Sequence, residues 1–246
     1  MAKNVAVIIC AAGSSRRFSG KKKKQYSNVD GRAAFLHSVE LFSGIDSVKQ
    51  IILAIAPDDQ ETVKVNWGPN LQFFNVKICL GGSERFETVK NAIELVKDDI
   101  DLIAVHDAVR CCTRKQWVED CFKAAEETDA AILACPVVAT VKKVEDNAIA
   151  ETIDRTNLYE AQTPQVFSVE LLKKAYDNLD NLDKAAISDD SQLVEALGHK
   201  VAIVKTDSSN IKITQSADIY IAQAIIKSRP KPTPKGPTGP YNEAQW

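Results

Sequence analysis

The sequence predicts an α/β fold with a doubly wound, mostly parallel sheet. Short runs rich in apolar, β-branched residues alternate along the chain with segments that carry apolar residues at helical spacing. The apolar runs are nearly continuous, as they are in strands that are buried on both faces. The length of 246 residues, with 45% hydrophobic and 26% charged residues, suits one large domain of this class and excludes a largely disordered chain.

Each predicted strand is an apolar run that ends at small, polar or turn-forming residues. The predicted strands span residues 5–10, 50–56, 76–80, 102–106, 130–138 and 201–206. The predicted helices carry apolar residues three and four positions apart, and several begin at a Ser, Thr or Asp that can cap them. They span residues 33–43, 83–97, 114–128, 169–179, 189–197 and 216–227. The repeated order of strand, helix and strand predicts parallel strands joined by helical crossovers.

Two segments depart from this alternation. Residues 140–152 predict two short antiparallel strands around the turn-forming Glu145-Asp146-Asn147, an arm too small to fold alone. Residues 229–246 hold five prolines and almost no apolar residues, which predicts an extended or disordered tail. We therefore expect a single domain over residues 1–228, with the arm at about residues 139–156, and a tail over residues 229–246.

The charge and the apolar pattern exclude several classes of partner. With 31 Lys and Arg against 33 Asp and Glu, the net charge is −2, so no global field attracts nucleic acid or an acidic membrane. No apolar run approaches the roughly 20 residues needed to cross a bilayer, and the first such run is poorly flanked for a signal peptide. The six cysteines form no CxxC pair. We therefore expect reduced thiols and a cytoplasmic protein without nucleic-acid or membrane partners.

The junction after the first predicted strand has the character of a phosphate-binding loop. Small residues and a glycine occupy positions 11–14, where backbone N–H groups can approach an anion, and two arginines and four lysines follow by position 24. The loop matches neither GxxxxGK[ST] nor GxGxxG, which disfavours a nicotinamide dehydrogenase. The alternative is an ordinary turn with solvated lysines. Lys24 is the lysine expected to contact phosphate, because Gln25-Tyr26 would anchor it.

This loop is the first of seven motifs that resemble, in the same order, those of the IspD-type sugar-phosphate cytidylyltransferases. The motifs of that family are AAGxGxRM followed by PKQ[YF], then GGxxRxxSV, VHDAARP, PVxDTxK with a later DR, QTPQ, TD[DE] and NIKxT. Their counterparts here are AAGSSRRF with KKQY, GGSERFETV, VHDAVR, PVVATVK with DR, QTPQ, SDD and NIKIT. The resemblance covers about residues 5–227.

The resemblance implies a Rossmann-like nucleotidyltransferase domain that moves CMP from CTP to 2-C-methyl-D-erythritol 4-phosphate, with Mg²⁺ and with release of pyrophosphate. The product would be 4-diphosphocytidyl-2-C-methyl-D-erythritol, on the non-mevalonate route to isoprenoids. The nucleophile of this reaction is a phosphate oxygen that is already ionised at neutral pH, so no general base is required. Because charge develops on phosphorus and on pyrophosphate, positioned cations and a metal ion lower the barrier.

The resemblance also assigns roles to individual residues. The catalytic cations are Arg17 and Lys24, and the metal ligand is Asp107. The nucleotide-binding residues are Ala11, Ala12, Gly13, Ser14, Gly81, Gly82, Ser83, Thr88 and Ala108. The residues that bind the sugar phosphate are Thr140, Arg155, Thr163, Ser188 and Lys212. Because the arm of this family crosses to a second subunit, the resemblance implies a homodimer with a composite site.

Four positions depart from the pattern of the family. Ser15 replaces the second loop glycine, Phe18 a methionine, Ala139 an aspartate and Cys111 a proline. The change at Ser15 is mild provided that the loop does not need a positive φ angle there. The change at Ala139 removes a carboxylate that could bind hydroxyl groups of the acceptor. Ribitol 5-phosphate therefore stays open as the alternative acceptor, and a catalytically inactive CTP-binding protein is the other alternative.

Overall fold

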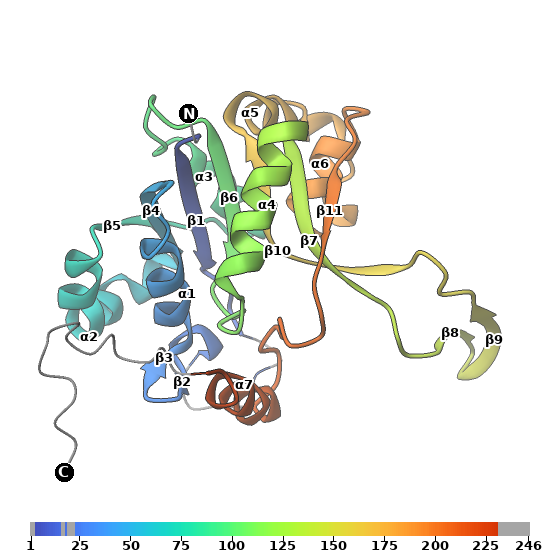
Figure 1. Ribbon diagram of the computed structural model, residues 1–246. Coiled ribbons are helices and arrows are strands. Elements are labelled where there is room, and N and C mark those ends of the chain that lie inside the picture. The colour runs from blue at the N-terminus through green and yellow to red at the C-terminus, as the bar shows by residue number, and fades with distance from the viewer. Residues whose placement is uncertain (1–2, 16–17, 19–22, 231–246) are drawn as a thin grey trace, which may run out of the picture.

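A seven-stranded sheet forms the centre of the molecule (Figure 1). In this computed structural model the described residues are 3–15, 18 and 23–230. The strands lie in the order β11-β7-β10-β6-β1-β4-β5. In chain order they are β1 (Val5–Ala11), β4 (Val48–Ile55), β5 (Val76–Leu80), β6 (Leu102–Asp107), β7 (Ala130–Pro136), β10 (Tyr159–Ser168) and β11 (Ala202–Lys205).

The sheet is parallel except at β10, which runs antiparallel to both of its neighbours, β6 and β7. The predicted α/β class with a mostly parallel sheet is confirmed, but the prediction omits β10. The sequence hides this strand because its first half is polar and because Pro164 lies inside it, and proline is a signal against a central strand. The pairing of β10 with β7 is interrupted around this proline, between Ala161 and Gln165.

Helices cover both faces of the sheet. In Figure 1, α1 and α4 lie in front of the sheet, and α3, α5 and α6 lie behind it. Alternate residues of β1 supply both layers of the core, because Val7 and Ile9 pack beneath α1 and α4 whereas Ile8 packs beneath the other three helices. The helices are α1 (Ala34–Ser43), α2 (Gln60–Phe73), α3 (Arg85–Ile93), α4 (Lys115–Thr128), α5 (Val169–Asp177), α6 (Asp190–Glu195) and α7 (Ala217–Lys227).

The prediction also omits α2. Val63 and Leu71 are its buried residues, so its apolar face is weak, and Gly68-Pro69 inside it is a sequence signal for the end of a helix. The predicted helix over residues 83–97 is too long, because α3 ends at Ile93. None of the helices among the described residues combines the length and the apolar character needed to span a membrane.

The carboxyl ends of the parallel strands meet at one edge of the sheet, and the direction of winding reverses there between β1 and β6. The chain moves from β1 to β4 and β5 on one side, whereas β6 lies on the other side of β1. Cys10, near the end of β1, pairs with Asp107 at the end of β6. Doubly wound sheets bind ligands at such a reversal, so the loops after β1 and β6 define the place of the site.

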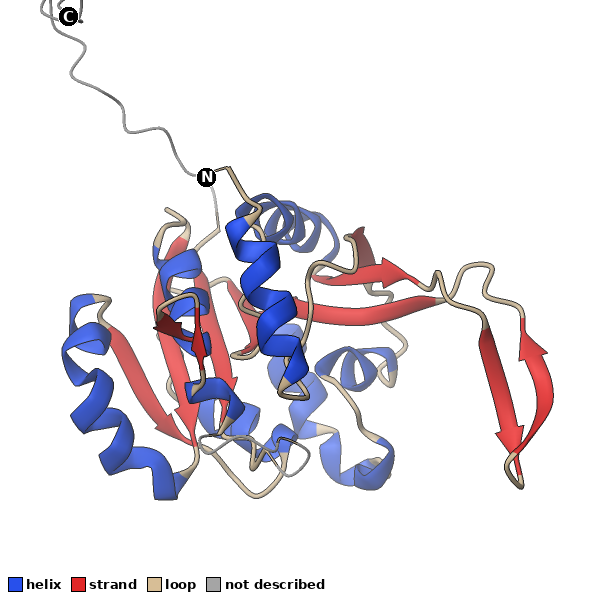
Figure 2. Ribbon diagram, turned by 90° about the horizontal axis from the view of Figure 1, so that it is seen from below, coloured by secondary structure: helices blue, strands red, loops and turns tan. Residues whose placement is uncertain are grey.

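The arm consists of β8 (Val141–Glu145) and β9 (Ala148–Ile153), which confirms the two predicted antiparallel strands. The turn between them places Asp146 and Asn147 at positive φ angles of 48° and 62°. This conformation suits the short polar side chains of Asp and Asn and matches the twist of a hairpin. The arm extends away from the sheet (Figure 2). A second small hairpin is formed by β2 (Asn28–Val29) and β3 (Arg32–Ala33).

The described chain ends shortly after α7. The Arg229 guanidinium donates a hydrogen bond to the carbonyl oxygen of Cys112. Residues 231–246, on which most of the predicted tail falls, lie outside the described residues. The division into a domain over residues 1–228 and a tail stays a prediction.

We expect Phe167→Ala, in β10, to lower the free energy of unfolding by about 3–5 kcal/mol, because it opens a cavity in the core. Phe167 is fully buried, with 0% of its surface exposed, whereas Phe73 on α2 is 82% exposed. The matched control Phe73→Ala should change the free energy of unfolding by less than about 1 kcal/mol. Urea unfolding at equal protein concentrations measures both. Equal effects of the two substitutions would contradict the central position of β10.

Candidate active site

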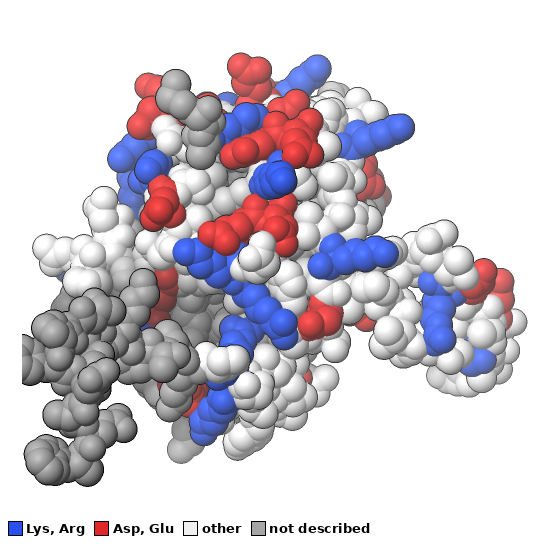
Figure 3. All heavy atoms as spheres, in the orientation of Figure 1, with Lys and Arg blue, Asp and Glu red and all other residues white. Residues whose placement is uncertain are grey.

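A cavity of about 300 Å³ opens at the carboxyl ends of β1 and β6. Five parts of the chain line it: the loop after β1, the short turn that begins at Lys24, the segment that leads into α3, the end of β6, and Lys212. On the face drawn in Figure 3, Lys and Arg alternate in small patches with Asp and Glu, so positive charge is not gathered over a wide area. The cations that line the cavity are Lys24, Arg85 and Lys212.

The loop after β1 is held in shape by the side chain of Gln25, which is 1% exposed. Its Nε2 donates to the carbonyl oxygens of Ala11 at 2.8 Å and Gly13 at 3.0 Å, and its Oε1 accepts from the Ser15 hydroxyl at 3.1 Å. The Ser15 hydroxyl in turn accepts from the Lys24 N–H at 3.2 Å. The loop and the turn at Lys24 are therefore fixed to each other before any ligand binds.

The condition on which the change at Ser15 is expected to be mild is not met. Ser15 has a φ angle of 56°, in the left-handed region where a glycine residue has no steric cost. A side chain in this conformation costs about 1–2 kcal/mol. The two hydrogen bonds of the Ser15 hydroxyl offset part of this cost, which explains how the loop keeps its shape without the glycine.

The Gly81-Gly82 turn packs against the loop so closely that side chains do not fit. A Cβ atom at Gly81 would lie 2.6 Å from the Cβ of Ala12 and 2.8 Å from the Oγ1 of Thr88. A Cβ atom at Gly82 would lie 2.4 Å from the Cβ of Glu87. The Thr88 hydroxyl accepts a hydrogen bond from the Gly82 N–H at 3.1 Å and donates to the carbonyl oxygen of Glu84. The two glycines thus allow the turn before α3 and the loop after β1 to form one continuous wall of the cavity.

Glu87 holds the start of α3 through a capping interaction. Its carboxylate accepts hydrogen bonds from the hydroxyl and the N–H of Ser83 and from the N–H of Glu84. These bonds lower the pKa of Glu87. They satisfy N–H groups at the N-terminal end of α3, beside the cavity that Ser83, Glu84 and Arg85 line.

Asp107 is the point at which three cations converge. Its Oδ2 lies 2.8 Å from Lys212 Nζ and 3.5 Å from Arg110 Nε, and its Oδ1 lies 3.9 Å from Arg85 Nε. Burial alone would raise the pKa of Asp107, but the charges of Lys212, Arg85 and Arg110 hold it well below its usual range. The carboxylate is therefore ionised at any physiological pH. Its backbone N–H donates to the Thr163 hydroxyl at 3.0 Å.

His106, beside Asp107, is a neutral structural residue. Burial, with a contribution from Arg110, lowers the pKa of His106 to about 3 despite the neighbouring carboxylate. Its Nδ1 lies 3.2 Å from the Thr163 hydroxyl, and its ring packs edge-to-face on Phe42. Burial likewise raises the pKa of Cys10, on the cavity wall, to about 12. Neither side chain is an ionised nucleophile at neutral pH, as the sequence suggests for a reaction without one.

A network of buried amide side chains places Lys212. Asn210 is fully buried, and its Nδ2 donates to Gln162 Oε1 at 2.8 Å while its Oδ1 accepts from the Thr113 hydroxyl at 2.7 Å. The carbonyl oxygen of Asn210 accepts a hydrogen bond from Arg110 Nη1 at 2.8 Å. The segment that carries Lys212 is therefore tied to both β10 and the turn after β6.

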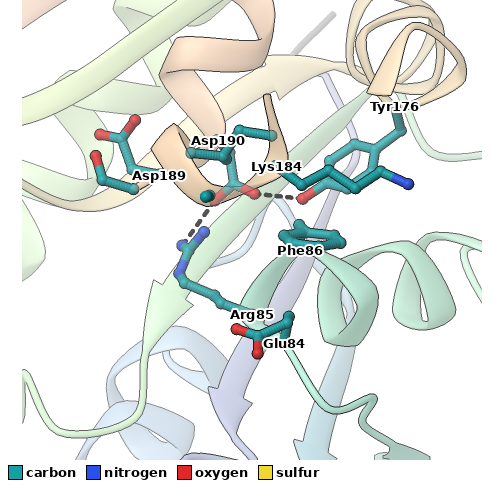
Figure 4. Close-up of a pocket in the computed structure, with 10 residues that line it drawn as sticks. Glu84, Arg85, Phe86, Tyr176, Lys184, Asp189 and Asp190 are labelled. Carbon is teal, nitrogen blue, oxygen red and sulfur yellow. Dashed lines mark hydrogen bonds and ion pairs between the residues drawn. The ribbon is translucent and has the colours of Figure 1, made fainter. Parts of the chain in front are cut away.

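A second pocket, of about 370 Å³, adjoins the first and shares Glu84 and Arg85 with it (Figure 4). At its back, Asp190 has no exposed surface, and its two carboxylate oxygens lie 2.7 Å from Arg85 Nη2 and 2.6 Å from the Tyr176 hydroxyl. The N–H groups of Asp190 and Ser191 donate to Gln165 Oε1. The QTPQ and SDD motifs thus form one structural unit behind Arg85.

The structure brings together most, but not all, of the residues assigned from the sequence. Ser188 lines the second pocket, and Thr140 and Arg155 lie exposed near the arm. Arg17 lies outside the described residues. Three further residues adjoin the cavity without lining it: Gly81, Ala108 and Thr163. The assigned residues that line the cavity are Ala11, Ala12, Gly13, Ser14, Lys24, Gly82, Ser83, Thr88, Asp107 and Lys212.

Five residues that organise the site have no binding or catalytic role in the sequence assignment, although Gln25 is expected there to anchor Lys24. Each stands inside one of the quoted motifs, within two positions of an assigned residue, and each is a polar residue that folding largely removes from water. Polar residues within apolar surroundings are the available signal for such roles. These residues are Gln25, Arg85, Arg110, Asp190 and Asn210.

Comparison with known proteins identifies the family. The family model for IspD, 2-C-methyl-D-erythritol 4-phosphate cytidylyltransferase, matches residues 5–228. A protein of that name from Endomicrobium trichonymphae is 44% identical over 225 residues, which cover 91% of this chain and 99% of the relative. One from Caldanaerobacter subterraneus is 37% identical over 230 residues, 91% of this chain and 99% of the relative.

Solved structures agree with this match. A crystal structure of 4-diphosphocytidyl-2C-methyl-D-erythritol synthase from Anaerococcus prevotii has a TM-score of 0.78 at 27% identity, covering 92% of this chain and 97% of that one. The 2-C-methyl-D-erythritol 4-phosphate cytidylyltransferase of Thermus thermophilus has a TM-score of 0.75 at 26% identity, covering 92% and 100%. The chain therefore belongs to the IspD family, the 2-C-methyl-D-erythritol 4-phosphate cytidylyltransferases.

Proposed function

We propose that this protein transfers CMP from CTP to 2-C-methyl-D-erythritol 4-phosphate, giving 4-diphosphocytidyl-2-C-methyl-D-erythritol and pyrophosphate. The single observation that carries the proposal is the family match over residues 5–228. The cavity supports it, because residues far apart in the sequence line it together: the small loop after β1, the glycine turn, Asp107 and Lys212. The reaction would take place in the cytoplasm.

CTP would bind with its phosphates on the loop after β1 and its base on the glycine turn. The small residues Ala11, Ala12, Gly13 and Ser14 allow backbone N–H groups to approach phosphate oxygens. The close packing of Gly81 and Gly82 supports a site in which backbone groups recognise the edge of the cytosine. Ser83, Thr88 and Ala108 complete the proposed nucleotide site.

The chemistry we propose is electrostatic. A phosphate oxygen of the acceptor attacks the α-phosphorus of CTP, the bond from that phosphorus to the bridging oxygen breaks, and pyrophosphate leaves with the electron pair. Lys24 and Arg17 would stabilise the negative charge that develops on the phosphates, and Lys212 would hold the acceptor phosphate near the α-phosphorus. The lowered pKa of His106 makes its ring a weak base, and the raised pKa of Cys10 keeps its thiol protonated, which supports a mechanism in which no side chain removes a proton.

Asp107 is the residue that would hold Mg²⁺. Among the described residues no group of three or more His, Cys, Asp or Glu side chains is placed to bind a metal ion. A single ionised carboxylate on a cavity wall still fits Mg²⁺, because this ion commonly takes one or two carboxylates and fills its shell with phosphate oxygens and water. When bound, the ion would neutralise charge on the triphosphate.

The acceptor site would be completed by a second copy of the chain. Thr140 and Arg155 do not line the cavity of their own chain, whereas Thr163, Ser188 and Lys212 lie in it or beside it. We therefore propose a homodimer in which the arm reaches the cavity of the partner. Exposed apolar residues on the arm support this, since Val144 is 57% exposed and Ile149, opposite it, is 65% exposed.

Release of pyrophosphate tests the reaction. With CTP and Mg²⁺, we expect kcat/KM for 2-C-methyl-D-erythritol 4-phosphate to exceed that for ribitol 5-phosphate at least about tenfold, because a site shaped for one set of hydroxyls discriminates strongly against another. Equal or inverted values would assign the acceptor differently, and this comparison matters because Ala139 lacks the carboxylate of the family. Binding of CTP without turnover would support the inactive alternative.

Substitution of either of the two proposed catalytic cations should lower kcat without lowering the stability of the fold. We expect Arg17→Ala and Lys24→Ala each to lower kcat by roughly 10²-fold or more, as loss of a transition-state donor does. The control is Lys115→Ala, because Lys115 lies on the surface of α4, with 54% of its side chain exposed, and should retain kcat. A turnover number near that of the unmodified protein for either proposed cation would show that it has no catalytic role.

The proposed dimer is tested on the arm. The double substitution Val144→Lys and Ile149→Lys should shift the protein from dimer to monomer in sedimentation velocity and raise KM for the acceptor more than KM for CTP, because it places two charges in the proposed interface. Phe73→Lys, at a more exposed site away from the arm, is the control and should leave the dimer intact. A monomeric unmodified protein would refute the proposed assembly.

A further inference from the structure

Arg85 links the cavity to the interior of the protein. It is the first residue of α3, its side chain is 30% exposed, and its guanidinium lies between two carboxylates. Nη2 lies 2.7 Å from Asp190, and Nε lies 3.9 Å from Asp107. Figure 4 shows the guanidinium pointing away from Glu84 and toward Asp190, whose other oxygen is joined to Tyr176. Arg85 thus forms a close ion pair with its inner partner, the buried Asp190, and a longer one with its outer partner, Asp107, at the cavity.

The inner partner of Arg85 is immobile. Asp190 is fully buried at the start of α6, it accepts a hydrogen bond from the Tyr176 hydroxyl of α5, and its N–H is bound by Gln165 of β10. This carboxylate cannot rotate without losing the hydrogen bond from Tyr176 and the ion pair with Arg85. Although burial alone would lower the pKa of Arg85, Asp190 and Asp107 hold it well above its ordinary value. The guanidinium is therefore a fixed, permanent charge.

The two guanidiniums that face Asp107 divide its oxygens between them. Arg85 approaches Oδ1, and Arg110 approaches Oδ2. The third cation, Lys212, is different, because 41% of its side chain is exposed and its flexible ammonium group can turn toward a bound phosphate. If Lys212 makes that turn, Arg85 and Arg110 keep one contact on each oxygen and so fix the rotation of the carboxylate about its Cβ–Cγ bond.

We infer that Arg85 is a positioning residue: anchored by Asp190 and Tyr176, it sets the orientation in which Asp107 meets the metal–triphosphate complex. The inference rests on the proposed function, because it assigns Asp107 to that complex. Partners behind a metal ligand commonly contribute 10- to 100-fold to metal affinity or activity, and a side chain displaced by about an ångström loses rate to a similar extent.

The test must separate positioning from folding. Arg85→Gln alone leaves the buried carboxylate of Asp190 without its cation, so this variant should be less stable. The double variant Arg85→Gln and Asp190→Asn removes both charges and keeps groups that can hydrogen-bond to each other and to Tyr176. We expect the double variant to unfold within about 5 °C of the unmodified protein and yet to have a kcat at least about tenfold lower. The control is Arg114→Gln, a surface residue whose side chain is 50% exposed, which should retain kcat.

Titration calorimetry supplies a readout that does not depend on turnover. We expect the double variant to bind CTP in the presence of Mg²⁺ at least about tenfold more weakly, while its affinity for CTP in EDTA changes less than about twofold. A double variant with the kcat and the Mg²⁺-dependent affinity of the unmodified protein would overturn the inference. An unmodified protein without cytidylyl transfer would overturn the proposed function instead, and the calorimetric comparison would still decide the role of Arg85.

Discussion

The rest of the site depends on the ion pairs that the Asp107 carboxylate forms with three cations. Asp107 ends a strand whose residues are all buried, where an unpaired charge would be costly. Cations from three different segments offset this cost: Arg85 from α3, Arg110 from the turn after β6, and Lys212 from the stretch after β11. The same arrangement gives the cavity an excess of positive charge in a protein whose net charge is −2. One carboxylate therefore both gathers the cations and leaves them able to attract a polyphosphate.

Side-chain amides hold the loops of this site where regular secondary structure ends. Gln25 bonds to the loop after β1, Gln165 to the start of α6, and Asn210 to β10 and to the turn after β6. Each amide satisfies several polar groups at once, which offsets the cost of burying backbone groups in loops at the sheet edge. Loops fixed in this way present their N–H groups and cations in a set geometry, and preorganised groups stabilise developing charge most effectively.

Much of this arrangement could be predicted from the sequence, and the failures have physical causes. The inner strands β1, β4, β6 and β7 were predictable because both of their faces are buried, which gives nearly continuous apolar runs. β10 and α2 were not, because Pro164 and Gly68-Pro69 are local signals that packing against the sheet overrides. The residues that line the cavity followed from the motifs. The role of Arg85 did not, because its partners Asp107 and Asp190 lie 22 and 105 positions further along the chain, and the positive φ angle of Ser15 has no signal in a single sequence.

The reversed direction of β10 has a consequence for the arm. Because β7 ends and β10 begins at the same end of the sheet, the chain can leave and re-enter the fold at the ligand-binding edge through one hairpin, without a helical crossover. Insertion or deletion of residues in pairs at the tip of this hairpin would change the length of the arm. Each remaining side chain of the arm would stay on the same face of its strand, and the register of the seven-stranded sheet would not change. The geometry of the proposed assembly could therefore diverge in sequence independently of the central sheet.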